Sequence, residues 1–536
     1  MERRLRGSRT LVGTVGALLL VASACTPAPT GTATAPSGAA APSAAAASAA
    51  VPKRGGELKF QLLRDSTTGY DPALATESTV FVINSAIFDT LAEIQPDGSI
   101  VPALAESWTI STDGLTYTFK IRSGVKFHNG RAMTATDVKY TIDRLRDPAT
   151  KSPRAGIYAV LTSVDAPDAT TVTLKLKEPY APLLSAFADI TAGIVPQEVV
   201  LSSGGTLNSN PVGTGPFKFV SWTRDQLMKV TANKDYWRTG LPRLDGITFS
   251  FNADSNARAA AIRSKDVDFL WNAPPELNAS LKKESTLDLL GGKGTLTWQY
   301  LNLNMQKEPF KDVRVRQAIY NAIDRDEILK VSRPDTGTPL NAGFLPPEHW
   351  AGVKDIVYKP DVAKATKLLA DAGFANGFEF TILALTGSDF HILTAQTIQQ
   401  QLKALKITVK VQVVDSGTQT AAQRNGTFEG IVSGFSGTID PDERFAQTFM
   451  AGGGTNYAKF SDAKVDELVI QARKTTSRDE RANLYRQAQL RVADIGAHAF
   501  VFNYHPYDAI QKFVKGYVFN PQLVSYRVLR DVWLDK

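Results

Sequence analysis

Alternating apolar and polar residues mark several strands of the chain. An Asp-Gly pair at residues 113–114, followed by alternation over residues 115–122, predicts a β-hairpin spanning about residues 108–122. The same period of two predicts strands at residues 172–176 and 407–413. Each has one apolar and one polar face, so we expect these strands to be half-buried.

Helix-capping residues precede four stretches in which apolar side chains recur at helical spacing. These signals are Thr134 with Asp137, Asp312, Asp361 with Gly373 at the far end, and Ser477 with Glu480. Helices and strands alternate from Lys53 to the C-terminus, and the sequence has no internal repeat. Such alternation is typical of an α/β architecture.

The N-terminus has the three parts of a secretory signal peptide. An arginine-rich stretch at residues 3–9 precedes an apolar run at residues 11–21, and the small residues 22–24 lead directly to Cys25. This arrangement resembles a bacterial lipoprotein signal, with residues 1–24 removed and Cys25 lipidated. Ordinary secretion with an incidental cysteine is the alternative.

Residues 25–52 are expected to form a flexible tether. After Cys25 this stretch contains only Thr, Pro, Ala, Gly, Ser and Val, with no charge, so it cannot bury enough apolar surface to fold. The rest of the chain has no apolar run of the roughly 20 residues that cross a membrane. We therefore expect an exported body, lipid-anchored on the outer face of the cytoplasmic membrane or in the periplasm.

Charge and cysteine content exclude several classes of protein. The net charge is +7 over 536 residues, of which +3 lies in residues 1–24, and no run of five like charges occurs. The sequence thus lacks the basic patch of a nucleic-acid-binding protein. The single cysteine excludes an intramolecular disulfide and a cysteine-rich zinc site.

The sequence offers little support for catalysis. It has neither a His-Glu-x-x-His pair nor a phosphate-binding loop, and residues 434–438 approach a nucleophile elbow but end in Thr438 instead of glycine. The five histidines are more often packed or surface residues than catalysts. We therefore expect no catalytic residue, no cofactor and no metal site, with an exported hydrolase as the alternative function.

A dozen segments in order resemble one family from residue 55 to the C-terminus. They include residues 55–58, 70–73, 101–108, 113–119, 122–130, 137–140, 210–217, 233–237, 309–318, 322–325, 368–374 and 440–442. This series resembles the extracellular solute-binding proteins of family 5, the peptide- and nickel-binding components of ABC importers.

The resemblance implies a two-lobed periplasmic-binding-protein fold of type II, in the large peptide-binding class. Residues 53–303 would form lobe I, with a subdomain at about 92–212, and residues 304–503 would form lobe II. Residues 504–536 would return to lobe I, so that the chain crosses near Tyr300–Asn304 and Phe500–Tyr504. Ligand-driven closure of the lobes would present the closed form to the transporter.

Some of the shared segments have a structural interpretation. Gly213 and Gly215 are expected to permit a tight turn before a strand that starts at Phe217. His128 is expected to be a hydrogen-bonded turn residue.

The ligand is less well defined than the fold. In peptide-binding relatives, an Asp three residues before the Asp-Pro-Asp turn pairs with the amino terminus of the ligand, and position 437 here is Gly. An unpaired buried ammonium is costly, so this change weakens the case for an ordinary peptide. Asp440 could substitute if the loop is shifted.

Positions in the family suggest which residues line the cleft. Candidate ligand contacts are Ser66, Thr67, Thr68, Tyr70, Trp271, Asn272, Asn302, Phe435, Ser436, Gly437 and Asp440. Aromatic walls with a few polar groups suit a small-molecule cleft, although core packing is the alternative role for each aromatic residue.

We therefore expect a monomeric receptor that captures a peptide or peptide-like solute and delivers it to ABC permease subunits. A modified peptide, an opine-like compound, a saccharide or a chelated metal are the alternative ligands. A sensory or chaperone role for the same cleft also remains open.

Overall fold

The computed structural model describes residues 51–536 except 294, 335, 341, 355, 357–358, 387, 436–439 and 522–527. The predicted signal peptide, the lipidation site Cys25 and nearly all of the predicted tether lie outside the described residues, as do Ser436 and Gly437. Within the described part, none of the helices combines the length and apolar character needed to span a membrane.

The first lobe is built on a mixed seven-stranded sheet in which β1 pairs in parallel with both β10 and β11. In sheet order its strands are β12 (Leu287–Gly291), β19 (Tyr507–Gln511), β11 (Phe269–Leu270), β1 (Glu57–Leu62), β10 (Gly246–Phe251), β9 (Leu227–Ala232) and β8 (Phe217–Thr223). The helices of this part are α1 (Ser78–Ile87), α6 (Ser255–Ser264) and α7 (Asn278–Leu281).

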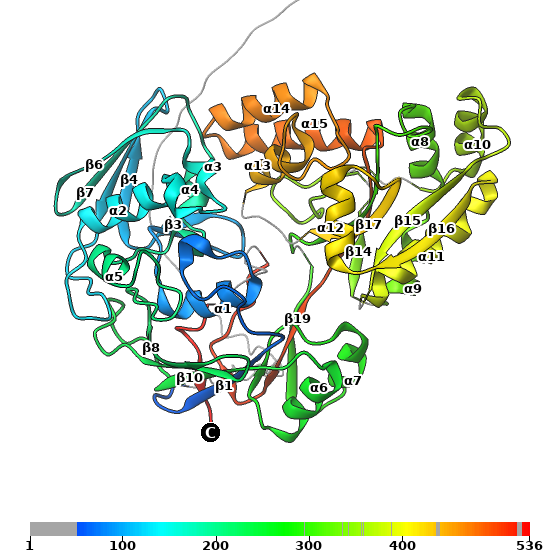
Figure 1. The fold of residues 1–536 in the computed structure, drawn as a ribbon. Coiled ribbons are helices and arrows are strands. Elements are labelled where there is room, and N and C mark those ends of the chain that lie inside the picture. Colours follow the sequence, from blue (N-terminus) through cyan, green and yellow to red (C-terminus); the bar gives the residue numbers. More distant parts are fainter. Residues whose placement is uncertain are drawn as a thin grey trace, which may run out of the picture. The chain divides into compact units, whose positions relative to one another are not determined.

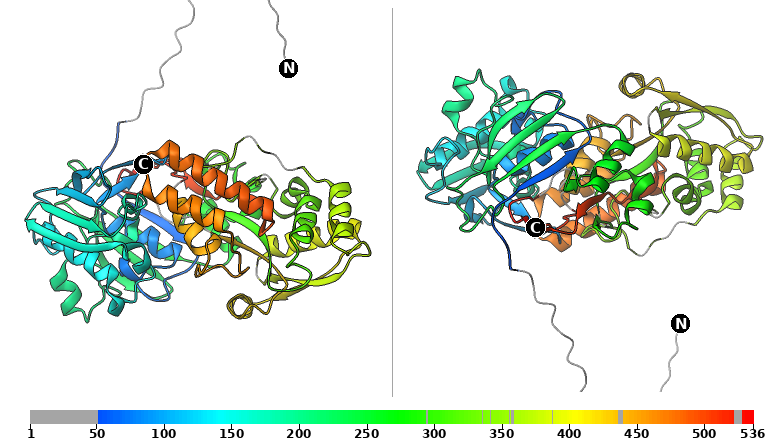
Figure 2. Two further views of the ribbon diagram at one scale, coloured as in Figure 1. Left: turned by 90° about the horizontal axis from the view of Figure 1, so that it is seen from above. Right: turned by 90° about the horizontal axis from the view of Figure 1, so that it is seen from below.

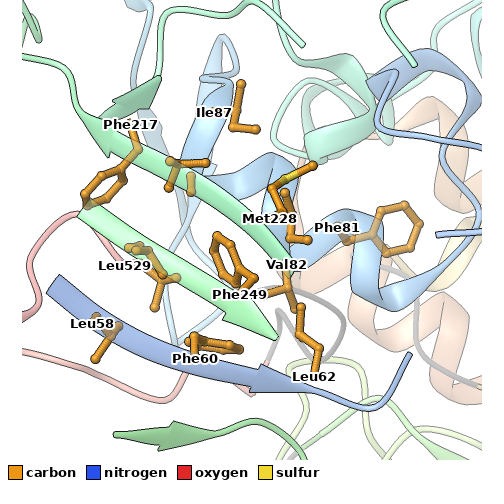
Figure 3. Packing of buried hydrophobic residues seen from close by; sticks show 14 of the residues in the cluster. Leu58, Phe60, Leu62, Phe81, Val82, Ile87, Phe217, Met228, Phe249 and Leu529 are labelled. Carbon is orange, nitrogen blue, oxygen red and sulfur yellow. The ribbon is translucent and has the colours of Figure 1, made fainter. Parts of the chain in front are cut away.

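The core of this sheet is aromatic. Leu58, Phe60 and Leu62 of β1 point into one cluster with Phe249 of β10 and residues of α1 (Figure 3). The ring of Phe60 also stacks on Phe269 of β11, with 4.3 Å between centroids. Burial of large side chains on adjacent parallel strands fixes the strand register, and therefore where each strand ends.

The second lobe is built on a mixed six-stranded sheet. In order its strands are β14 (Gly337–Pro339), β18 (His498–Tyr504), β13 (Trp298–Leu303), β17 (Gly430–Phe435), β15 (Glu379–Leu385) and β16 (Thr408–Val414). Every residue of β13 is buried, as expected of a central strand covered on both faces.

Helices surround this second sheet. They are α8 (Val313–Ala322), α9 (Arg325–Ser332), α10 (Val362–Asp371), α11 (Asp389–Leu402), α12 (Ser416–Asn425), α13 (Pro441–Arg444), α14 (Ala463–Lys474) and α15 (Arg478–Ile495). Helix α11 packs on β15 and β16, and α8 packs on α10 (Figure 1). Helices α14 and α15 lie side by side (Figure 2).

A subdomain of the first lobe has its own antiparallel sheet and its own hydrophobic core. In order the strands are β4 (Ala105–Ile110), β5 (Thr116–Ile121), β7 (Thr171–Leu176) and β6 (Leu161–Asp168). The helices are α2 (Ala135–Arg146), α3 (Ala155–Tyr158), α4 (Leu183–Ala186) and α5 (Gln197–Ser202). Two short pairs complete the strands, namely β2 (Ala92–Ile94) with β3 (Ile100–Pro102), and β20 (Val514–Lys515) with β21 (Trp533–Leu534).

The chain passes between the two large sheets twice, and the predicted crossings near Tyr300–Asn304 and Phe500–Tyr504 instead fall on strands β13 and β18 of the second sheet. Strand β13 pairs with β17 from Trp298 onward, so the first passage lies at residues 292–297, before this strand. The return lies at residues 505–506, just after β18. The two passages are bonded together, because the hydroxyls of Thr295 and Thr297 donate to the Tyr504 carbonyl at 2.8 and 2.7 Å.

The hairpin and all four helix starts predicted from the sequence are confirmed. Strands β4 and β5 pair across Asp113-Gly114, and Gly114 has a φ of +69°. Thr134 and Asp137 form a capping box at α2, and Ser477 accepts a hydrogen bond from the Glu480 amide at α15. These signals are local, which is why the sequence alone reveals them.

The two glycines before β8 are required for a different reason from the predicted turn. A methyl group on Gly213 would lie 2.3 Å from the Ile87 carbonyl oxygen, and one on Gly215 would lie 2.5 Å from the Ile87 carbonyl carbon. Close approach to α1, and not a left-handed backbone, therefore excludes other residues. His128 is a hydrogen-bonded turn residue as expected, with Nε2 3.0 Å from the Gly215 oxygen.

Replacing Gly213 by alanine should lower the free energy of unfolding by about 2 kcal/mol, because the new methyl group cannot fit beside the backbone of α1. Gly454→Ala is the matched control, because nothing lies within 4 Å of the added group. Urea unfolding of the two variants measures the difference, and equal stabilities would contradict the packing argument.

Candidate ligand-binding site

The two parallel strands β1 and β11 end at the same edge of the first sheet. They terminate at Leu62 and Leu270, and the Trp271 amide still donates to the Gln61 carbonyl at 3.1 Å. The loop after β1 and the two residues after β11 therefore start side by side. In α/β sheets, ligands bind outside the carboxyl ends of the strands, so this edge is one half of the candidate site.

The predicted contacts in the loop after β1 divide into buried and exposed residues. The Ser66 hydroxyl donates to the Gly69 carbonyl at 2.9 Å, and the buried Tyr70 hydroxyl donates to Asp65 at 2.6 Å. Burial raises the pKa of Tyr70, so this phenol stays neutral. Ser66 and Tyr70 thus shape the loop, while Thr67 and Thr68 are the exposed side chains at its tip.

Trp271 and Asn272 are held rigidly at the same edge. The Trp271 side chain is buried in the core of the first sheet, and Asn272 has a φ of +49°. The Asn272 amide donates to Asp508 at 2.9 Å, and Arg258 donates to the carbonyls of both residues at 2.5 and 3.0 Å. Asn272 is the more exposed of the two and is the better ligand contact.

The second half of the candidate site lies at the corresponding edge of the second sheet. Strands β15 and β17 are parallel and end at Leu385 and Phe435, and Trp298 at the start of β13 is the register partner of Phe435. The Phe435 ring stacks on Tyr300 at 5.2 Å, and the Arg444 guanidinium carbon lies 3.9 Å above Phe435. This edge is therefore an aromatic wall with a cation stacked on it.

Asn302 does not lie at this aromatic edge. It pairs with Ile431 and His498 near the far end of β13, and its side chain is fully buried. Alternate residues of a strand are more than 6 Å apart, so the three positions between Trp298 and Asn302 separate Asn302 from the aromatic edge.

Asp440 forms a buried ion pair. Arg481 lies 2.8 Å from both of its carboxylate oxygens, and the Ser185 hydroxyl of the first-lobe subdomain donates to it at 3.1 Å. Asp442 is engaged in the same way by Arg473 at 2.7 Å and by the Tyr180 hydroxyl at 3.0 Å. We call residues 440–442 the bridging turn, because it ties the second lobe to the subdomain of the first.

The surroundings of the bridging turn are polar and partly open. Arg154 of the subdomain pairs with Glu443, and both are largely buried. Burial raises the pKa of Asp442, an effect opposed by Arg473. A cavity of about 510 Å³ lies here between the subdomain and the second lobe, lined among others by Tyr180, Asp442 and Arg473. This volume is within the range of small-molecule sites.

The structure also reveals polar residues that the sequence did not single out as ligand contacts. His391 in α11 follows the end of β15, and a methyl group on Gly434 would lie 3.8 Å from its Nε2 atom. Burial and the charge of Arg333 lower the pKa of His391 to about 4, so this ring is neutral. Gln299 is buried beside it, bonded through its oxygen to Thr394 at 2.9 Å. No strand is predicted directly before His391 from the sequence, so no sequence signal was available for this residue.

The described part of the chain shows no arrangement of side chains suited to binding a metal ion. Among those residues, no group of three or more His, Cys, Asp or Glu side chains is placed to hold a metal ion. The two sheet edges instead offer aromatic rings, hydroxyls and amides, which bind organic solutes.

Comparison with known proteins identifies the family of this chain. Residues 99–457 match the family model described as bacterial extracellular solute-binding proteins, family 5 Middle. This chain belongs to the family 5 bacterial extracellular solute-binding proteins. It is 32% identical over 432 residues to the glutathione-binding protein GsiB of Pectobacterium atrosepticum, covering 79% of this chain and 84% of the relative.

Two solved structures of binding proteins share the fold. One is AgaA of A. tumefaciens R10 in complex with agropinic acid, with 30% identity, a TM-score of 0.77, and coverage of 90% of this chain and 99% of that chain. The other is DppA of Helicobacter pylori in complex with the peptide STSA, with 28% identity, a TM-score of 0.77 and the same coverage. This family 5 protein therefore has the type II periplasmic-binding-protein fold, and it is the solute-binding component of an ABC transporter.

Replacing Asp440 by asparagine should destabilise this solute-binding protein by about 3 kcal/mol even without ligand, because Arg481 would lose its buried counter-charge. Asp479→Asn, at an exposed position in the first turn of α15, should change stability by less than about 1 kcal/mol. Chemical unfolding tests both. An Asp440 variant as stable as the wild type would mean that this carboxylate is held for a ligand instead.

Proposed function

We propose that this chain is a non-catalytic receptor that captures a peptide-like solute with no free ammonium group and delivers it to the permease. The observation that carries this proposal is the pairing of Asp440 and Asp442 with Arg481 and Arg473. The carboxylate that binds a peptide amino terminus in relatives is replaced by Gly437. Both acids of the bridging turn are already neutralised, so neither is available for a second cation.

The two passages between the sheets supply a hinge. We propose that residues up to 291 and from 507 onward form the first lobe, and that residues 298–504 form the second. The described contacts that join these lobes outside the hinge are mostly polar, such as those of Tyr180 and Ser185. Polar contacts of this kind can separate and re-form in water at small net cost, as domain opening and closure require.

The ligand would lie between the two sheet edges. The aromatic wall around Phe435 suits the flat peptide groups or side chains of a small organic solute, and the exposed hydroxyl of Thr68 suits its polar atoms. The relatives named for glutathione, agropinic acid and a peptide support a solute of this size and polarity.

The N-terminal segment supports anchoring beside the permease. We propose that Cys25 is lipidated after removal of residues 1–24, and that residues 25–52 tether the binding body to the membrane surface. Relatives of this family are extracellular binding proteins, which agrees with export.

Replacing Cys25 by serine should release the exported protein from the membrane fraction, because the anchor is lost while the export signal remains. Fractionation of bacterial cells that express the two forms, with mass spectrometry of the N-terminal peptide, measures this. A serine variant that stays with the membrane, or a wild-type Cys25 without acyl chains, would contradict anchoring.

The ligand is best identified by native mass spectrometry of the protein purified in detergent, followed by denaturing release of the bound solute. We expect a peptide-like solute whose amino group is absent or substituted, and N-acetylation of a bound peptide should change its affinity less than threefold. An unmodified peptide that loses more than tenfold in affinity on acetylation would contradict the proposal.

Truncating Phe435 to alanine should weaken solute binding about tenfold or more, because stacking area on the wall is lost. Phe374→Ala is the matched control, since Phe374 is also half-buried against another aromatic ring, Phe378, but lies after α10. Calorimetry with the released solute compares them. Equal affinities would place the ligand away from the aromatic wall.

A further inference from the structure

One buried arginine near the second sheet edge has no ion-pair partner among the described residues. Arg333 follows the last residue of α9, and its side chain lies between two rings, with the guanidinium carbon 4.1 Å from the Phe390 centroid and 4.7 Å from that of Tyr504. The residue is 8% exposed. Among the described residues, none forms a hydrogen bond or ion pair with this side chain, and its Nε atom is wholly buried without a partner.

Several other buried arginines among the described residues have at least one carboxylate or carbonyl partner, although the Arg258 Nε and one terminal nitrogen of Arg325 have none. Arg144 donates twice to Asp71 at 2.9 and 2.6 Å, and Arg481 pairs with Asp440. Where a carboxylate is absent, a backbone carbonyl accepts, as Phe500 does from Arg325 at 2.7 Å. Arg333 departs from this pattern, because the charge of Glu276 reaches it only at longer range.

An uncompensated guanidinium is expensive to bury. Aromatic faces attract the cation but accept none of its five N–H groups in good hydrogen bonds. Burying a charge without a partner costs several kcal/mol, so the fold has reason to keep Arg333 only if a group from outside completes it. The planar guanidinium fits a carboxylate with two parallel hydrogen bonds.

The position of Arg333 connects it to both halves of the candidate site. Phe390, which stacks on the guanidinium, is also 4.3 Å from the ring of His391 at the second sheet edge. Glu276 lies in the short helix Pro275–Leu277 that follows Trp271 and Asn272 at the first sheet edge. Arg333 therefore lies at the second sheet edge, within reach of the charge of Glu276.

Further polar atoms without partners lie around this point. In the described part of the chain, the Gln299 amide nitrogen, both ring nitrogens of His391 and the Ser388 hydroxyl are buried and unsatisfied. Native proteins rarely leave so many buried polar atoms unpaired in one place unless a ligand or ordered water completes them.

We propose that Arg333 binds a carboxylate of the captured solute between Phe390 and Tyr504, and that this protein is specific for acidic solutes. Gln299 and His391 donate further hydrogen bonds to the same ligand. The inference rests on the proposed function and adds the charge of the ligand. A solute with a carboxylate and no free ammonium group matches a site in which Arg333 has no partner among the described residues and both acids of the bridging turn are already paired.

The direct test follows the Arg333 side chain by NMR of arginine Nε–Hε groups, with acetate as the probe and acetamide as the neutral control. The Arg333 signal is assigned by its loss in Arg333→Gln, and Arg263, paired with Glu284 on the surface, is the internal reference. We expect acetate to shift the Arg333 signal saturably and acetamide to leave it unchanged. No saturable shift with acetate, or equal shifts with both probes, overturns the inference.

A second test uses a defined mixture of N-acetyl dipeptides, each present as the free acid and as the C-terminal amide. Mass spectrometry after dialysis measures which are retained. The wild type should retain acids over amides, and Arg333→Gln should lower the affinity for the acids about thirtyfold or more, with loss of this preference. Arg333→Lys should restore part of the preference, and Arg263→Gln should leave it unchanged.

The outcomes separate the two proposals. If Arg333→Gln retains the same acids as tightly as the wild type, the inference is wrong and the proposed function stands. If the wild type retains no solute, the capture of peptide-like solutes is contradicted, while the acetate titration still decides whether Arg333 binds carboxylates. Urea unfolding should show Arg333→Gln to be at least as stable as the ligand-free wild type, because the substitution removes a buried charge that has no hydrogen-bonding partner among the described residues.

Discussion

The arrangement of this protein depends on two buried ion pairs in one turn. Asp440 and Asp442 are each paired with an arginine of the second lobe, and each also accepts a hydrogen bond from a hydroxyl of the first-lobe subdomain. Because a buried carboxylate without a partner is costly, these pairs fix the position of the bridging turn. They also remove both acids from the set of groups that could bind a ligand.

Because both acids of the bridging turn are paired, other groups must bind the ligand. The second sheet edge retains an aromatic wall around Phe435 and a cation at Arg333 that has no partner within the described residues. The first sheet edge contributes the exposed hydroxyl of Thr68, held in place by the turn at Ser66, whereas the Thr67 hydroxyl already donates to Glu77 at 2.5 Å. The combination favours an acidic, peptide-like solute and explains why a family known for peptide uptake can lack the acid that binds an amino terminus.

The sequence predicted those features that depend on neighbouring residues. Caps such as Thr134 with Asp137, the Asp113-Gly114 turn and the ordered family segments are local patterns, and they were sufficient for the fold. It did not distinguish Tyr70, which shapes a loop from within the core, from Phe435, which lines an edge, because burial of an aromatic ring depends on tertiary packing. Arg333 could not be identified from the sequence either, because the absence of a partner among the described residues is evident only in the folded structure.

The central claim is that one acidic solute lies between the two sheet edges, with its carboxylate on Arg333 and no cation on Asp440. A crystal structure of the protein with its co-purified solute tests this most directly. We predict a carboxylate forked on the Arg333 guanidinium and contacts from the solute to both Phe435 and the loop at residues 66–70. A solute whose ammonium group pairs with Asp440, or one that leaves Arg333 unpaired, would contradict the claim.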